Sequence, residues 1–190
     1  MPMLHAIIPA LWIVFVVYWL ISARFAKRTV GGPAKWKHFA IRFCILVLVV
    51  VVLSSATLRH GLRAAQIYQA SHALMAATGI VLVALGLAVA VWGRIHLGRN
   101  WGTPMSQREN PELVTGGPYA HVRHPIYAGI ILAMVGSMIG HSIAWTLPLL
   151  LFGAYFIYSA RREEEFMCRQ FPEAYPDYMR RTHMLVPYVL

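Results

Sequence analysis

The first 108 residues of this chain contain no acidic side chain. All seven acids come later, at Glu109, Glu112, Glu163, Glu164, Glu165, Glu173 and Asp177. Charged residues make up only 13% of the chain and hydrophobic residues 58%, whereas soluble domains carry about 25% charged residues. This scarcity excludes an ordinary soluble domain and predicts an all-α integral membrane protein. We expect one domain over 1–190, with membrane scaffold in 1–92 and the chemistry in 93–190.

Cysteine is also scarce, with only Cys44 and Cys168. A disulfide framework is therefore excluded, and no cysteine–histidine spacing indicates zinc. His121 and His124 lack a recognisable third or fourth ligand, so we predict no metal site. The net charge of +10 does not indicate nucleic acid, because the basic residues flank apolar spans and there attract anionic membrane lipids.

Long hydrophobic runs are what the chain does contain. A membrane helix needs about 20 mostly apolar residues, and 4–23, 39–58 and 73–92 meet this requirement. The first run lacks a basic leader and a cleavage site, so we expect a retained helix. The uncharged run 126–159 is too long for one span, and Gly140-His141-Ser142 is a plausible turn within it. We predict a hairpin of two helices there, about five spans in all; the alternative is one long helix kinked at Pro148.

Lysine and arginine predict the orientation. They are dense after the first span, sparse after the second, and dense again after the third and in the C-terminal tail. The positive-inside rule then places the N-terminus outside and the C-terminus in the cytoplasm. All the acids lie on this cytoplasmic side, as expected for a multi-pass protein of a prokaryotic inner membrane.

The segment 116–129 brings polar chemistry to the mouth of a membrane helix. His124 precedes Pro125, a pair that favours a helix start, so His124 is expected at the entrance, near free backbone N–H groups. Tyr127 follows one turn later. Two interpretations stay open: a functional site, or an interfacial histidine and a belt tyrosine that only anchor the helix.

A second polar cluster follows the last apolar run. Arg161-Arg162-Glu163-Glu164-Glu165 on a helix would place Ser159 and Glu163 on one face. The segment 171–178 then repeats aromatic residues at about one helical turn, and Arg180-Arg181-Thr182 follows. A solvated charge run at a membrane exit would explain the first part. The whole tail is better interpreted as a short cytoplasmic lid over a site.

The C-terminal half of the chain contains a specific, ordered set of motifs. In order they are Leu113-Val114-Thr115-Gly116-Gly117-Pro118-Tyr119, Arg123-His124-Pro125-Ile126-Tyr127-Ala128-Gly129, Glu163-Glu164, Phe171-Pro172-Glu173-Ala174-Tyr175, and the terminal Arg181-Thr182 with Val186-Pro187. They resemble the isoprenylcysteine carboxyl methyltransferase family and its wider group of small membrane methyltransferases, which includes phospholipid methyltransferases. The resemblance covers 113–187.

This resemblance implies S-adenosylmethionine as the methyl donor. The donor contacts that it implies are Pro111, Glu112, Leu113, Val114, Tyr119, His124, Pro125, Ile126, Tyr127 and Glu163. Glu163, Glu164 and Arg181 are the implied catalytic residues. In the eukaryotic carboxyl methyltransferases an arginine stands four residues before the first glutamate of the pair and contacts the substrate. Here that position is Ser159, so Arg161, Arg162 or Arg180 is expected to contact the acceptor instead.

The expected function is methylation of a lipophilic acceptor from the bilayer, at the carboxylate or thiol of a prenylcysteine-like or other lipid-like molecule. Two other classes stay open. One is a sterol-reductase-like membrane reductase that uses NADPH, and the other is a small membrane protein without catalysis.

Overall fold

The computed structural model describes residues 2–24, 73–101 and 112–186. Within them the helices are α1 (Pro2–Ala23), α4 (Ala73–Leu97), α5 (Pro125–Gly140), α6 (Thr146–Gln170) and α7 (Ala174–Arg181), with short 3₁₀ turns η1 (Gly98–Asn100), η2 (Gly117–Ala120) and η3 (Ile143–Trp145). An isolated bridge pairs Val122 with His183, and no strand is present in the described residues. The prediction of an all-helical chain is therefore confirmed for the described part.

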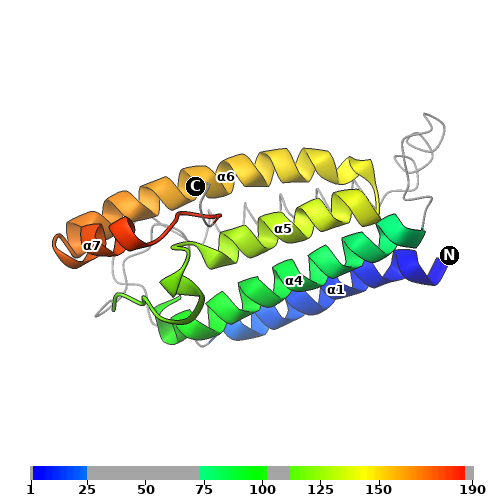
Figure 1. The fold of residues 1–190 in the computed structure, drawn as a ribbon. Helices are drawn as coiled ribbons and strands as arrows, with labels where there is room; N and C mark the ends of the chain where they lie inside the picture. The colour runs from blue at the N-terminus through cyan, green and yellow to red at the C-terminus, as the bar shows by residue number, and fades with distance from the viewer. Residues whose placement is uncertain (1, 25–72, 102–111, 187–190) are drawn as a thin grey trace.

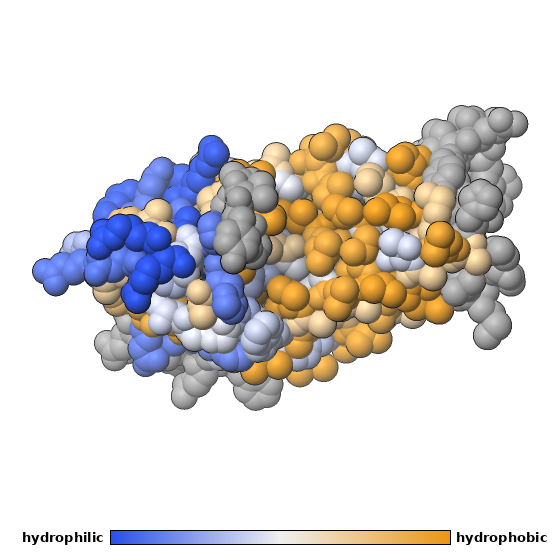
Figure 2. Space-filling view, viewed as in Figure 1, coloured by the Kyte–Doolittle hydropathy of each residue, from blue (hydrophilic) through white to orange (hydrophobic). Residues whose placement is uncertain are grey.

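The four long helices lie side by side, with α5 between α4 and α6 and with α1 packed along α4 (Figure 1). By length and composition, α4 and the stretch Ile143–Gln170 could cross a membrane, and Ala6–Ser22 and Pro125–Gly140 are shorter apolar helices. Apolar side chains cover most of the length of this bundle, whereas hydrophilic side chains gather at the end that carries α7 (Figure 2). The predicted span 39–58 lies outside the described residues, so the number of spans stays a prediction.

The run 126–159 forms the expected hairpin. Helix α5 ends at Gly140, the η3 turn follows, and α6 begins at Thr146 and runs back along α5 (Figure 1). The Ser142 hydroxyl stabilises the turn by accepting a hydrogen bond from the Ala144 backbone N–H at 3.2 Å. Pro148 lies in the first turn of α6, where its missing N–H has no helical partner to lose. The alternative of one kinked helix is therefore wrong.

Helices α4 and α5 approach each other through glycine. A Cβ atom added to Gly86 would lie 2.5 Å from the Gly129 carbonyl oxygen, and one added to Gly129 would lie 2.7 Å from the Ala90 backbone nitrogen. Small residues permit such contact between membrane helices, whose association depends on close packing. The apolar residues Ile8, Phe15, Val83, Leu87, Ala90 and Ala133 form the adjoining core. This packing sets where the N-terminus of α5, and thus His124, lies relative to α4.

Candidate active site

The site lies at the hydrophilic end of the bundle, where two tyrosines attach η2 to its neighbours. The Tyr119 hydroxyl donates to the Gly93 carbonyl oxygen of α4 at 3.3 Å, and the Tyr178 hydroxyl of α7 donates to the Tyr119 carbonyl oxygen at 2.6 Å. Burial raises the pKa of Tyr119 and raises the pKa of Tyr178 to about 12. Both phenols therefore stay neutral donors at physiological pH and join α4, η2 and α7.

Gly117 allows the chain to enter η2. Its φ of +61° lies in the left-handed region, and a Cβ atom there would overlap the His96 ring. Gly117→Ala is expected to lower the free energy of unfolding by about 1–2 kcal/mol from the backbone alone, with the clash in addition. Thermal unfolding in detergent checks this against Gly116→Ala, since a Cβ at Gly116 meets nothing within 4 Å and its φ is −92°. Equal losses in the two variants would contradict the assignment.

His124 occupies the entrance of α5, as the sequence predicted. It is the residue before Pro125, and its carbonyl oxygen accepts the first helical hydrogen bond, from the Ala128 N–H at 3.0 Å. The buried His124 ring stacks on Tyr127 with centroids 5.5 Å apart, and Tyr127 stacks on Phe156 of α6 at 4.8 Å. Three aromatic faces from two helices thus form one continuous stack.

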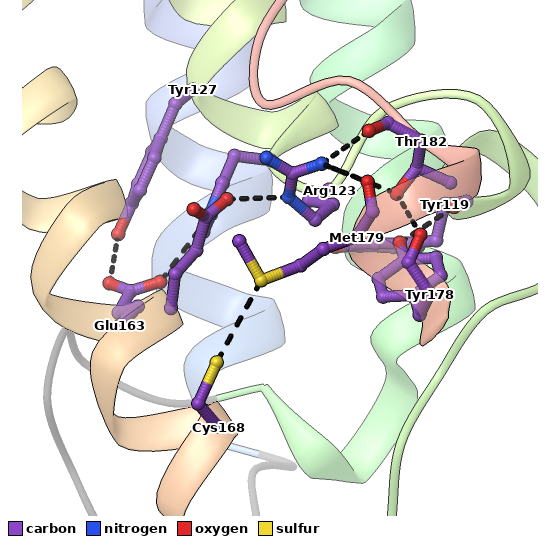
Figure 3. Close-up of polar contacts among 10 residues, drawn as sticks. Tyr119, Arg123, Tyr127, Glu163, Cys168, Tyr178, Met179 and Thr182 are labelled. Carbon is purple, nitrogen blue, oxygen red and sulfur yellow. Dashed lines mark hydrogen bonds and ion pairs between the residues drawn. The ribbon is translucent and has the colours of Figure 1, made fainter. Parts of the chain in front are cut away.

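Glu163 lies against this stack. The Tyr127 hydroxyl donates to Glu163 Oε1 at 2.5 Å, and Glu163 Oε2 lies 3.6 Å from His124 Nδ1 (Figure 3). The Glu163 side chain is 26% exposed. In the part of the chain that the structure describes, no arginine or lysine pairs with this carboxylate. Glu163 is therefore a partly accessible carboxyl group that has no arginine or lysine partner among the described residues.

The neighbouring Glu164 has a different partner. Its Oε1 atom accepts a hydrogen bond from Arg123 Nε at 2.6 Å, and the two side chains are only 11% and 10% exposed. The same Oε1 atom lies 3.3 Å from His124 Nε2, although that contact lacks hydrogen-bond geometry. The two adjacent glutamates thus flank one imidazole, and among the described residues an arginine pairs with Glu164 but not with Glu163.

The C-terminal segment 182–185 forms a wall of the site. The Arg123 N–H donates to the His183 carbonyl oxygen at 2.8 Å, and the His124 N–H donates to that of Met184 at 3.1 Å. Met184 and Leu185 are buried, in a cluster that Tyr127 and Ala128 join. The tail is therefore packed against the histidine motif, while its closure as a lid stays a prediction.

The other candidate residues are spread more widely. Glu112 accepts a hydrogen bond from Asn100 at 3.2 Å, and Leu113 and Val114 are half-buried beside it in sequence. Pro125 and Ile126 are buried in the first turn of α5. Pro111 lies outside the described residues.

The structure does not bring the predicted arginines to Glu163. Arg161 and Arg162 are exposed on α6, and Arg162 pairs with Glu165 at 2.6 Å. Arg180 pairs with Asp177, and Arg181 donates to the Asp177 carbonyl oxygen at 3.3 Å on the exposed face of α7. Their roles in catalysis and acceptor binding stay predictions.

Sequence reasoning assigned no individual role to Arg123 or Phe156, and it treated the segment 182–185 only as part of the predicted lid. Arg123 stands directly before His124, which was the one local signal, but its partner Glu164 is 41 positions away. Phe156 looks like any other apolar residue of a membrane helix, and only the stack on Tyr127 distinguishes it.

Comparisons with known proteins show the family of this chain. A family model described as phospholipid methyltransferase matches residues 74–174. The cobalt-zinc-cadmium resistance protein CzcN of Cupriavidus metallidurans is 35% identical over 110 residues, which are 57% of this chain and 49% of that protein. Protein-S-isoprenylcysteine O-methyltransferase B of Arabidopsis thaliana is 25% identical over 168 residues, which are 86% of this chain and 81% of that protein.

One solved structure shares the fold. It is the eukaryotic intramembrane Ras methyltransferase ICMT (isoprenylcysteine carboxyl methyltransferase), with a TM-score of 0.57 and 18% identity over 84% of this chain and 55% of that chain. This chain thus spans about half the length of CzcN and of the solved structure. At this identity the likeness shows a shared fold and leaves the reaction and the acceptor open.

Proposed function

We propose that this chain, which belongs to the phospholipid methyltransferase family, transfers a methyl group from S-adenosylmethionine to a lipophilic acceptor in the membrane. One observation carries the proposal. The partly accessible Glu163 carboxylate is held by Tyr127 beside the stacked rings of His124, Tyr127 and Phe156, and it has no arginine or lysine partner among the described residues.

This arrangement fits a cationic ligand. S-adenosylmethionine, when bound, supplies a methyl group on a positively charged sulfur, and it also carries an ammonium group. A carboxylate and the faces of aromatic rings both attract such charges. Glu163, Tyr127 and His124 would hold the donor from α5 and α6, with Tyr119 of η2 close by in sequence. The remaining implied contacts, at 111–114 and 125–126, are proposed on the resemblance alone.

The chain itself would hold the two reactants in place and exclude water from them. Holding two reactants in near-attack geometry can lower a barrier by roughly 7–11 kcal/mol, and this needs rigid side chains. The stack of three rings and the buried Met184 and Leu185 supply a rigid, apolar wall that excludes water. The site lies at the hydrophilic end of the bundle, so a polar donor could enter from the cytoplasm while an apolar acceptor enters from the bilayer.

The acceptor group decides whether a base is needed. The carboxylate of a prenylcysteine-like molecule, or the thiolate form of a thiol on another lipid-like molecule, is already ionised and needs none. An amine must lose a proton, and Glu163 and His124 are the groups placed to take it. We propose the carboxylate or thiol of a lipid-like molecule as the acceptor, with Arg161, Arg162, Arg180 and Arg181 as the arginines that could turn toward an anionic group.

Calorimetry with the detergent-purified protein tests the proposal. We expect S-adenosylmethionine to bind and NADPH not to bind. A radiolabelled methyl assay on membrane lipid extract and on a farnesylcysteine analogue should then show transfer to one of them. Binding of NADPH alone would support a reductase, and binding of neither compound would leave a protein without this catalysis.

A further inference from the structure

We propose that Arg123 and Glu164 are positioning residues of this site. In this proposal their ion pair anchors the tail segment 182–185 and holds the His124 imidazole against Glu163, while neither side chain contacts donor or acceptor. The inference rests on the proposed function, and it gives Glu164 a different task from the catalytic role that the resemblance implied.

Arg123 is the first part of the argument. Its Nη1 atom donates to the carbonyl oxygens of Thr182 and Met179, the latter at 3.3 Å, and its Nε atom donates to Glu164 (Figure 3). One guanidinium therefore joins the start of α5, the end of α6 and the end of α7. The backbone N–H groups of Arg123 and His124 also donate to the carbonyl oxygens of His183 and Met184. The tail is therefore held by side-chain and by backbone hydrogen bonds.

Glu164 is the second part. Its Oε1 atom contacts both Arg123 Nε, at 2.6 Å, and His124 Nε2, at 3.3 Å. The opposite ring nitrogen, His124 Nδ1, faces Glu163 Oε2 at 3.6 Å. The negative charge of Glu164 lies beside the Nε2 edge of the imidazole, and its electrostatic attraction favours the ring orientation in which Nδ1 faces Glu163. Glu164 thus acts on Glu163 and Tyr127 through His124.

Access separates the two glutamates. The Glu164 side chain is 11% exposed and pairs with the Arg123 guanidinium, whereas Glu163 is 26% exposed and pairs with no arginine among the described residues. A cationic donor would have to displace Arg123 to reach Glu164. In this proposal Glu163 therefore binds the ligand, and Glu164 positions Arg123 and His124.

The informative variant is Glu164→Gln, because the amide oxygen can still accept from Arg123 but the charge that faces Arg123 and His124 is gone. Glu165→Gln is the matched control, on the same helix but 51% exposed and paired with Arg162 at 2.6 Å. We expect hydrogen exchange of the peptide containing the Arg123 and His124 amides to rise roughly 10-fold in Glu164→Gln relative to the control. The KM for S-adenosylmethionine should also rise roughly 10-fold, with a smaller change in kcat.

A double-mutant cycle distinguishes positioning from direct contact. In an Arg123→Ala background, Glu164→Gln should add less than about 2-fold to the KM, because the pair acts as one unit. Where Arg123→Ala does not fold, Arg123→Lys serves, since lysine keeps the charge but cannot bridge Glu164 and both carbonyl oxygens.

Several outcomes would overturn the inference. Fully additive effects would mean that Glu164 contacts the donor itself. Exchange and KM in Glu164→Gln equal to those in Glu165→Gln would mean that the pair positions nothing. Wild-type protein that binds no donor would refute the proposed function and the positioning role together, and the exchange data would still decide whether the pair anchors the tail.

Discussion

Glu163→Ala is expected to weaken S-adenosylmethionine binding by roughly 100-fold or more, measured by calorimetry on the folded protein. Removing one partner of a buried, hydrogen-bonded charge pair costs about 2–5 kcal/mol, much of it because the other charge is left unpaired. Glu163 lies against the ring stack and has no arginine or lysine partner among the described residues. Its removal would therefore leave the positive charge of the bound ligand without a counter-charge. Turnover should fall with it, because the donor would no longer be held.

Two companion variants sharpen this result. Tyr127→Phe keeps the ring that stacks between His124 and Phe156 but removes the hydroxyl that donates to Glu163. Since hydrogen bonds to charged groups contribute about 1.5–3 kcal/mol, we expect a loss in affinity of roughly 10-fold or more, and no greater than that of Glu163→Ala. Glu165 is exposed on the same helix, and exposed charges contribute little. Glu165→Ala should therefore change the affinity for S-adenosylmethionine by less than about 2-fold. Wild-type affinity in Glu163→Ala would refute the assignment of this carboxylate to the donor.

Gly129→Ala is expected to lower the free energy of unfolding by about 1–3 kcal/mol, and Gly129→Leu to prevent folding altogether. The added Cβ would meet the backbone of α4, at the Gly86 carbonyl oxygen and at Ala90, and a backbone cannot move aside as a flexible side chain can. The helices would have to separate, which would also move the N-terminus of α5 away from α4. Reversible unfolding in detergent micelles gives the free energy.

Gly153→Ala is the matched control for that prediction. Gly153 lies within α6, and a Cβ atom there meets nothing within 4 Å. The substitution should be neutral or stabilise by up to about 1 kcal/mol, because alanine has the higher helix propensity. Similar losses at Gly129 and Gly153 would show that glycine in these helices matters for some reason other than the α4–α5 contact.

Local signals predicted much of the fold correctly. The hairpin in 126–159 followed from the length of the run and from Gly140-His141-Ser142, and the start of α5 followed from His124-Pro125. The helical continuation through 161–165 places Ser159 and Glu163 on one face, as their spacing predicted. These features depend on residues a few positions apart, which is the range over which backbone preferences and helix periodicity act.

The arginines show where such signals end. Arg161 and Arg162 were predicted to replace the arginine that the resemblance expects at Ser159, and Arg180 and Arg181 were predicted as further contacts. All four are exposed on outer faces of α6 and α7. Arg123 carries the contacts instead, from a position 41 residues before Glu164 and 59 before Thr182. Helix periodicity specifies which residues share a face, but the face that turns inward depends on how the helices pack.

By itself the sequence determined the class of protein. An N-terminal part without acids and long apolar runs predicted a helical membrane protein, because hydropathy is a property of consecutive residues. The resemblance of its ordered motifs to a known family implied a methyltransferase, and the family match agrees with this. Only the tertiary structure decided that Glu163 and Glu164 differ, one left accessible beside Tyr127 and the other paired with Arg123. The reason is that an ion pair depends on distance through space. The glycine contact between α4 and α5, the α5–α6 hairpin and the backbone pairing of the tail together set that distance.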